Sequence, residues 1–135
     1  MENCIVKSVS NKNALVLAYL GDSVFSLMVR KYLVETCGEK VRGLNKRANS
    51  VVCAKAQAEF MTKIMPSLDE IEKSVVMRAR NSHINNKAKN STYGEYSLAT
   101  QFEALVGFWY LTNQDEKLNG MFDDLVKEKL CWLTE

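Results

Sequence analysis

The stretch Asn13–Glu35, NALVLAYLGDSVFSLMVRKYLVE, decides the fold of this chain. It predicts one long helix that is apolar on nearly every side, which is typical of a buried helix. Asp22 is the only charged residue between Ala14 and Val29, and Gly21 stands directly before it. A buried lone carboxylate is costly unless it is paired, hydrogen-bonded or bound to a metal, and glycine costs about 1 kcal/mol relative to alanine inside a helix. The two residues together predict that another backbone passes very close to Gly21.

A second stretch, Ser97–Leu111, SLATQFEALVGFWYL, has the same character and is the candidate neighbour. It is mostly apolar, with a single acid, Glu103, and with Gly107 four residues later. Residues four apart share a helix face, so a crossing at the two glycines would bring Asp22 and Glu103 to a common point. Two carboxylates without a neighbouring base form a hard-oxygen site, which suits Mg²⁺ or Mn²⁺. The alternative is that each acid caps a nearby backbone group or lies at a helix edge.

Length and composition predict one all-α domain over residues 1–135, in which residues 1–12 form a short N-terminal lead-in. The chain is 47% hydrophobic and 25% charged, with one proline and six glycines, and its long stretches show helical periodicity. No run of eighteen apolar residues occurs, so no membrane span is expected. The cysteines match no metal-binding template and predict reduced thiols in a cytoplasmic protein; they are Cys4, Cys37, Cys53 and Cys131.

Helix ends and breaks are predicted from local signals. Residues Val41–Met65 have a core-facing stripe and are expected to be helical, with a break near Asn49. Ser67 and Asn113 are each followed three residues later by a glutamate. This spacing is that of a capping box, so both residues are predicted to cap the helix that follows them.

The segment Lys73–Gly94 holds five Lys or Arg residues, one histidine and no acid. Its residues 81–94 predict a long polar loop, and such loops in small domains are often functional. Their charges and hydrogen-bonding groups suit phosphate and sugar contacts, although a solvated loop without a function is the alternative. The loop leads directly into the helix of Glu103, as expected if it holds a polyanion over a metal. Three further cations are interpreted as solvated surface, with nucleic-acid binding as the alternative: Lys46, Arg47 and Lys55.

Four motifs in order then link the chain to a known family: LAYLGDSV (Leu17–Val24), AKAQAE (Ala54–Glu59), RARN (Arg78–Asn81) and FEALVG (Phe102–Gly107). Through them the chain resembles the catalytic domain of ribonuclease III. It is most similar to the Mini-III ribonucleases, which have that domain without a double-stranded-RNA-binding domain. The resemblance covers roughly residues 13–130.

The resemblance implies an all-helical homodimer that hydrolyses double-stranded RNA with magnesium and leaves 5′-phosphate and 3′-hydroxyl ends. Mini-III ribonucleases mature the precursor of the large-subunit (23S) ribosomal RNA. The expected activity is therefore that of an endoribonuclease, and the expected partner is double-stranded RNA from that precursor. Whether a ribosomal protein bound to the precursor is also a partner stays open.

The resemblance also assigns roles to individual residues. Asp22 and Glu103 match the catalytic, metal-binding acids of the family. Tyr19 falls where the family has an aromatic residue at the dimer contact. The positions where Mini-III proteins are expected to meet RNA are Arg78, Arg80, Asn81, Lys87 and Lys89.

Three positions depart from full-length ribonuclease III, which has acids where this chain has Leu15, Ala18 and Thr100. Mini-III proteins share this loss, and it leaves the number of metal ions open. Magnesium tolerates one or two carboxylates completed by water and phosphate oxygens, so the chemistry remains feasible. Two other functions stay open: a dimer that holds structured RNA without cutting it, and a helical protein-interaction domain with no RNA role.

Overall fold

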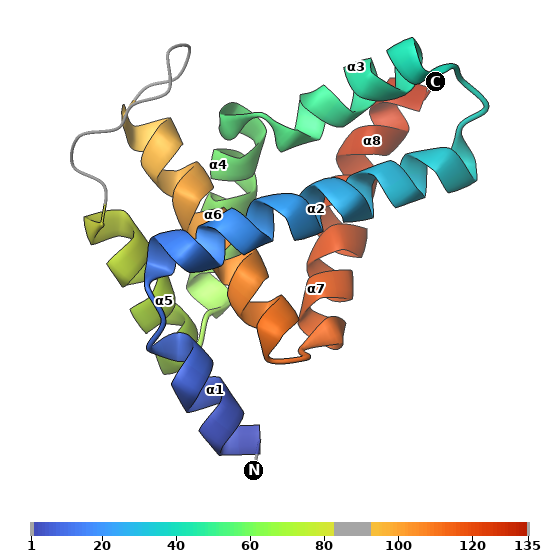
Figure 1. Cartoon of the computed structure of the whole chain (residues 1–135). Helices are drawn as coiled ribbons and strands as arrows, with labels where there is room; N and C mark the ends of the chain where they lie inside the picture. The colour runs from blue at the N-terminus through green and yellow to red at the C-terminus, as the bar shows by residue number, and fades with distance from the viewer. Residues whose placement is uncertain (1, 83–92, 135) are drawn as a thin grey trace.

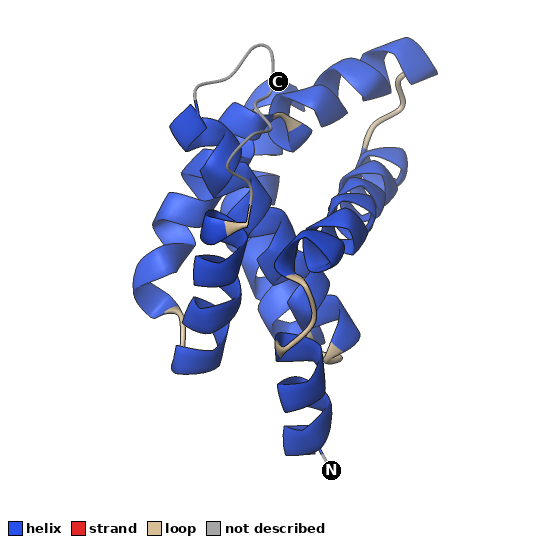
Figure 2. Ribbon diagram, turned by 60° about the vertical axis from the view of Figure 1, so that its left-hand side comes forward, coloured by secondary structure: helices blue, strands red, loops and turns tan. Residues whose placement is uncertain are grey.

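The computed structural model describes the backbone of residues 2–82 and 93–134, and the side-chain surroundings of residues 4–82 and 94–130. Within these ranges the chain is helical and contains no strand, as Figure 2 shows. This confirms the predicted all-α fold. In chain order the elements are α1 (Glu2–Ser10), α2 (Ala14–Thr36), α3 (Val41–Val52), α4 (Ala54–Ile64), the 3₁₀ turn η1 (Met65–Ser67), α5 (Glu70–Asn81), α6 (Tyr93–Leu111), α7 (Asp115–Met121), the π-helical turn η2 (Phe122–Val126) and α8 (Lys127–Thr134).

The two apolar helices predicted from the sequence, α2 and α6, cross at the centre of the molecule (Figure 1). Helices α4 and α5 pack along α6, and α3 packs against α2. Rings from three helices meet beneath the crossing: Phe25 packs edge-on against Phe102 at 5.0 Å between ring centroids, and Phe60 lies 5.8 Å from Phe102. These side chains are almost fully buried. Burial on several sides explains why α6 lacks a clear polar face, whereas α2 is buried along one stripe and exposes apolar side chains on another.

Two segments differ in detail from their predictions. Residues 1–12, expected as a lead-in, include helix α1, whose Val9 is buried in the core. The expected helix over Val41–Met65 breaks at Cys53, four residues beyond the predicted point, where the backbone is extended (φ −73°, ψ 158°). Ser50 is helical, and its hydroxyl donates to the carbonyl of Arg47 at 2.5 Å.

The capping box of α5 lies two residues beyond its predicted place. The N-cap is Asp69, whose side chain accepts from the backbone N–H of Glu72 at 2.8 Å. Glu72 Oε1 in turn accepts from the backbone N–H of Asp69 at 2.8 Å. Ser67 belongs instead to η1, where its hydroxyl donates to the carbonyl of Ile64. The prediction that Ser67 caps α5 is therefore wrong.

The predicted cap at Asn113 is also wrong. The N-cap of α7 is Gln114, and it makes no side-chain cap hydrogen bond. Asn113 has a φ of 56°, in the left-handed region. Asparagine tolerates this conformation better than most residues, so Asn113 serves to turn the chain between α6 and α7.

The thiols of Cys4, Cys37 and Cys53 are not paired in disulfides with one another. Cys131 lies outside the residues whose side chains are described.

No single helix of the described chain has both the length and the apolar character needed to cross a membrane. The pair Cys4–Ser10 and Ala14–Thr36, bent by 104°, meets those criteria only when its two helices are taken together.

Candidate active site

Gly21 and Gly107 form the closest contact between α2 and α6. A Cβ atom added to Gly21 would overlap the backbone carbonyl of Glu103 and lie 2.9 Å from the backbone nitrogen of Gly107. A Cβ atom added to Gly107 would overlap the carbonyl of Leu17 and lie 3.2 Å from the nitrogen of Gly21. Because no side chain fits on either surface, only glycine allows the two backbones to touch. The crossing predicted from the sequence is therefore confirmed.

This crossing brings the two predicted acids together. Asp22 follows Gly21 on the exposed edge of α2, whereas Glu103 lies partly buried on α6. The carboxyl group of Asp22 interacts with that of Glu103 and helps to raise its pKa. Asp22 thus lies at a helix edge, as the alternative allowed, and it also meets Glu103 at the crossing.

Burial raises the pKa of Glu103 to about 8, and the hydrogen bond to Asp22 and its negative charge add to this effect. The cause is physical: a carboxylate withdrawn from water beside a second carboxylate resists ionisation unless a counter-charge is present. With a pKa of about 8, Glu103 is mostly protonated at neutral pH in the metal-free protein. Among the described residues, no lysine or arginine contributes to the raised pKa of Glu103.

The pair has the donor chemistry of a magnesium site. Asp22 and Glu103 offer oxygen ligands at one point, and a divalent cation bound there would supply the counter-charge that the pair lacks. Among the described residues, no group of three or more His, Cys, Asp or Glu side chains could hold a metal. An ion at this site would take its other ligands from water and phosphate, as Mg²⁺ commonly does.

The three departures from full-length ribonuclease III agree with this small donor set. Ala18 is buried, and Leu15 is partly exposed but apolar. Thr100 is buried, and its hydroxyl donates to the carbonyl of Tyr96 in its own helix at 3.0 Å. None of the three side chains adds a ligand to the acid pair.

The predicted RNA-binding residues have different surroundings at the end of α5. Arg80 and Asn81 are exposed in its last turn. Arg78 is half-buried, and its Nη1 donates to the backbone carbonyl of Lys12 at 2.8 Å. Lys87 and Lys89 lie outside the described residues.

A second basic surface lies at α3, where the sequence predicted solvated side chains, with nucleic-acid binding as the alternative. Lys40 and Lys46 are exposed, and Arg47 pairs with Glu39 at 2.5 Å. These residues line an open cavity of about 750 Å³ with Gly38, Gly43 and Ser50. The signal available in the sequence was the absence of any acid between Lys40 and Ala58.

Helix α2 keeps one apolar face uncovered. Tyr19, the predicted dimer contact, is 82% exposed, and Val16 and Leu27 are 57% and 68% exposed. Beside them is a cavity of about 430 Å³, lined mainly by apolar side chains of α2 and by Tyr110 of α6. The all-round apolar pattern of α2 did not reveal which face the fold leaves open.

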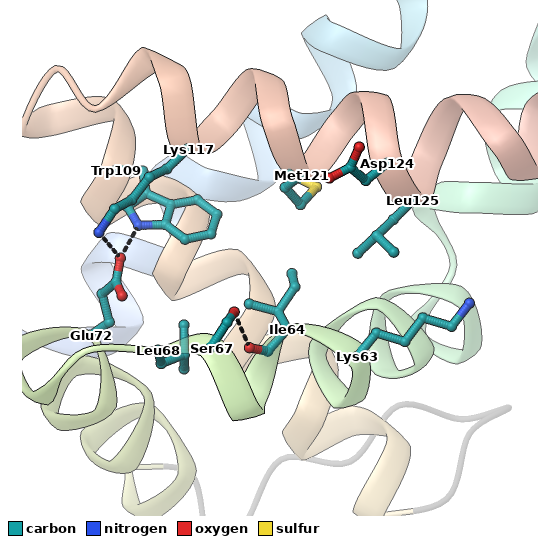
Figure 3. A pocket seen from close by; sticks show the side chains of 10 residues that line it. All are labelled: Lys63, Ile64, Ser67, Leu68, Glu72, Trp109, Lys117, Met121, Asp124 and Leu125. Carbon is teal, nitrogen blue, oxygen red and sulfur yellow. Dashed lines mark hydrogen bonds and ion pairs between the residues drawn. The ribbon is translucent and has the colours of Figure 1, made fainter.

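Another cavity, of about 320 Å³, lies between η1, α6 and α7 (Figure 3). The buried carboxylate of Glu72 reaches it, where Oε2 accepts from Trp109 Nε1 at 2.6 Å and from Lys117 Nζ at 2.7 Å. Neither Asp22 nor Glu103 lines this cavity. These hydrogen bonds join α5, α6 and α7. Trp109 is buried within this network and serves as a packing residue.

Comparison with known proteins identifies the family of this chain. The ribonuclease III domain matches residues 15–114. Mini-ribonuclease 3 of Brevibacillus brevis is 44% identical over 106 residues, covering 78% of this chain and 79% of that protein. Mini-ribonuclease 3 of Desulfitobacterium hafniense is 43% identical over 119 residues, covering 88% and 75%. A crystal structure of a Fusobacterium nucleatum protein has a TM-score of 0.82 at 34% identity, covering 88% of this chain and 95% of that one.

The matched region extends from the start of α2 to the loop before α7, and so it contains the helix crossing and both acids. The relatives are similar over most of their own length as well as over most of this chain. The chain therefore belongs to the ribonuclease III domain family and is an endoribonuclease.

Proposed function

We propose that this protein cleaves double-stranded RNA with magnesium and that Asp22 and Glu103 are its catalytic, metal-binding acids. The observation that carries the proposal is the acid pair at the glycine crossing. Burial, and after it the neighbouring carboxyl group of Asp22, raises the pKa of Glu103. A pair that ionises unfavourably without a counter-charge is unfavourable for folding but useful for binding a metal. Mn²⁺ has similar ligand preferences and could substitute.

The two acids have distinct tasks in this mechanism. Asp22 and Glu103 would hold the cation as two carboxylates, the proton of Glu103 being released to solvent, and the touching backbones of α2 and α6 keep the carboxylates in place. A magnesium ion bound there would supply Lewis-acid chemistry for the in-line attack of water on the phosphodiester. The exposure of Asp22 leaves the site open to a phosphodiester from solvent. The products would carry 5′-phosphate and 3′-hydroxyl ends.

RNA would be held by two basic surfaces whose residues lie between Asp22 and Glu103 in the sequence. Arg80 and Asn81 contribute from the end of α5, together with Lys87 and Lys89 in the segment that follows. Lys40, the N-cap of α3, and Lys46 of α3 are exposed cations with the same chemistry. Side chains cannot read the deep major groove of A-form RNA, so recognition would rest on shape, phosphates and 2′-hydroxyls.

A homodimer would cover the exposed face of α2. Tyr19, Val16 and Leu27 are large apolar side chains that water penalises, and the adjoining cavity could accept a ring from a second copy. Asp22 is on the same helix as Tyr19, so a dimer formed here would bring two acid pairs near one another. Such a pair of sites suits cleavage of both strands of a duplex.

We further propose that the natural substrate is the precursor of the 23S ribosomal RNA. The cleavage would take place in the cytoplasm. This proposal is supported by the similarity to proteins named Mini-ribonuclease 3. A ribosomal protein bound to that precursor is a possible additional partner. Cleavage of precursor RNA with and without ribosomal proteins would test this separately from the basic activity.

The deciding experiment measures cleavage of a long RNA duplex by the purified protein, once with Mg²⁺ and once with excess chelator. The Asp22→Asn variant is assayed in the same two conditions. We expect cleavage only by the wild type and only with metal, since removal of one of two carboxylates leaves the cation without its site. The variant should still bind the duplex. Cleavage by Asp22→Asn at the wild-type rate would refute the assignment of the acids.

A wild type that binds duplex RNA but never cuts it would favour the RNA-binding alternative. The small donor set, two carboxylates among the described residues, is the observation that keeps this alternative open. If the protein did not change the electrophoretic mobility of duplex RNA at low salt, this result would instead favour the protein-interaction domain.

A further inference from the structure

Arg78 connects two parts of the chain that are distant in sequence. It stands in the last turn of α5, and its Nη1 donates to the carbonyl of Lys12, 66 residues away. Its own backbone carbonyl accepts the hydroxyl of Ser82. One residue therefore ties the end of α5 to the connection between α1 and α2.

The guanidinium of Arg78 is poorly placed to bind a phosphate. Nη1 is already used by Lys12. Nη2 is shielded from solvent and has no hydrogen-bond partner among the described residues. Arg80, two residues later, is exposed. The two arginines thus carry the same charge in the same helical turn but differ in access to RNA.

The connection that Arg78 holds is also the start of α2. The backbone N–H of Lys12 donates to Val9 of α1 at 3.0 Å. The next residue, Asn13, is the N-cap of α2, and its Oδ1 accepts from the N–H of Leu15 at 2.8 Å. Asp22 lies further along this same helix. The bond from Arg78 therefore sets the position of the α2 N-terminus against the end of α5.

We propose that Arg78 is a positioning residue for cleavage: it holds the start of α2, and hence Asp22, in register with the RNA-binding end of α5, without binding RNA phosphate itself. The part of this inference that concerns RNA rests on the proposed function. The inference gives Arg78 a different role from Arg80 and Asn81, although all three belong to the RARN motif.

The matched variants are Arg78→Met and Arg80→Met, which keep an unbranched stem and remove one positive charge each. Duplex binding would be measured against salt, and cleavage as kcat and KM. A residue that neutralises one phosphate contributes roughly 0.9 to the slope of log K against log salt. We expect Arg80→Met to lose about that much slope and to raise KM. Arg78→Met should keep the wild-type slope and lower kcat by roughly tenfold, because small displacements of a catalytic group are costly.

A loss of slope in Arg78→Met equal to that in Arg80→Met, with kcat unchanged, would overturn the proposal. Arg78→Gln keeps an N–H donor without the charge, so it should recover part of the kcat lost in Arg78→Met. Ile64→Val, a core substitution in α4 far from Lys12 in sequence, controls for stability. It should lower the thermal midpoint without lowering kcat.

A measurement without RNA keeps this inference separate from the proposed function. Hydrogen exchange should be faster in Arg78→Met than in the wild type at the first turn of α2, where the N–H groups of Val16 and Leu17 donate to Asn13. Arg80→Met should leave these amides unchanged. Wild-type exchange rates in Arg78→Met would refute the positioning role, even if the protein cleaves RNA.

Discussion

Glu103 keeps its proton to about pH 8, whereas an ordinary glutamate loses it near 4.5. The spacing between Glu103 and Gly107 predicted that this residue would meet Asp22, because helix periodicity is a local property. The pKa could not be predicted in the same way. It depends on how much water the neighbouring helices exclude and on the contact with a carboxylate from another helix.

This pKa predicts an unusual dependence of stability on pH. Between about pH 4.5 and about pH 8 the native metal-free protein holds a proton that the unfolded chain has lost, so its free energy of unfolding falls as pH rises through this window. We expect a loss on the order of 3 kcal/mol, reduced from the full value because Asp22 is exposed to solvent. Urea unfolding of the protein in the presence of a chelator, at about pH 4.5 and about pH 8, measures this loss of unfolding free energy.

Glu103→Gln is the control for this prediction, because it keeps the shape of the side chain and cannot ionise. It should remove most of the pH dependence in that window. A wild type that is more stable at pH 8 than at pH 5 would contradict the raised pKa.

At the scale of the elements, the α5 cap shows where local signals become ambiguous. Ser67 with Glu70 and Asp69 with Glu72 are overlapping capping boxes in the sequence. The structure uses the second, since Glu72 is also held by Trp109 of α6 and Lys117 of α7. These partners lie far along the chain, so no local pattern could rank the two boxes.

Substitution at the helix crossing should affect both stability and activity. Gly107→Ala would place a methyl group against the carbonyl of Leu17, which should cost about 1–3 kcal/mol by overpacking. The helices must separate, so Glu103 moves relative to Asp22 and RNA cleavage should fall strongly. Thermal unfolding and cleavage assays would measure the two effects.

Gly120→Ala in α7 is the matched control. A Cβ atom there would meet nothing within 4 Å. Alanine is a better helix former by up to about 1 kcal/mol, so this variant should be as stable as the wild type or more so, with unchanged cleavage. Equal behaviour of the two alanine variants would contradict the close contact of α2 and α6.

The Glu72 network should contribute strongly to stability. Glu72→Gln replaces one carboxylate oxygen by an amide, so that the side chain can no longer accept from Trp109, Lys117 and the Asp69 N–H together. Loss of one partner of a buried ion pair costs roughly 3–5 kcal/mol, and we expect a value near the lower end because glutamine keeps one acceptor. Glu70→Gln, at an exposed residue paired with Lys73 at 3.6 Å, should change stability by less than about 0.5 kcal/mol. Similar unfolding midpoints in urea for the two variants would argue against the network.

At the scale of the whole molecule, the exposed face of α2 has the strongest consequence for assembly. If two copies pair through it, the native mass in solution is twice 15.3 kDa. Leu27→Glu should then give a monomer, because it places a charge in an apolar contact. Sedimentation equilibrium measures the mass directly.

Ile71→Glu provides the comparison, because Ile71 is an exposed apolar residue on α5 and does not belong to α2. It should keep the wild-type mass. A wild type that sediments as a monomer at micromolar concentration would refute the dimer.

The sequence by itself determined the helical class, the two central helices and the acid pair, because periodicity and the spacing of glycine and acid are properties of short segments. Tertiary structure decided the rest. It turned Arg78 toward Lys12 rather than toward solvent, and it left Tyr19 exposed on a helix that is apolar all round. Each of these outcomes depends on which distant segments come to cover a side chain. That information is set by packing over the whole chain and not by its local pattern.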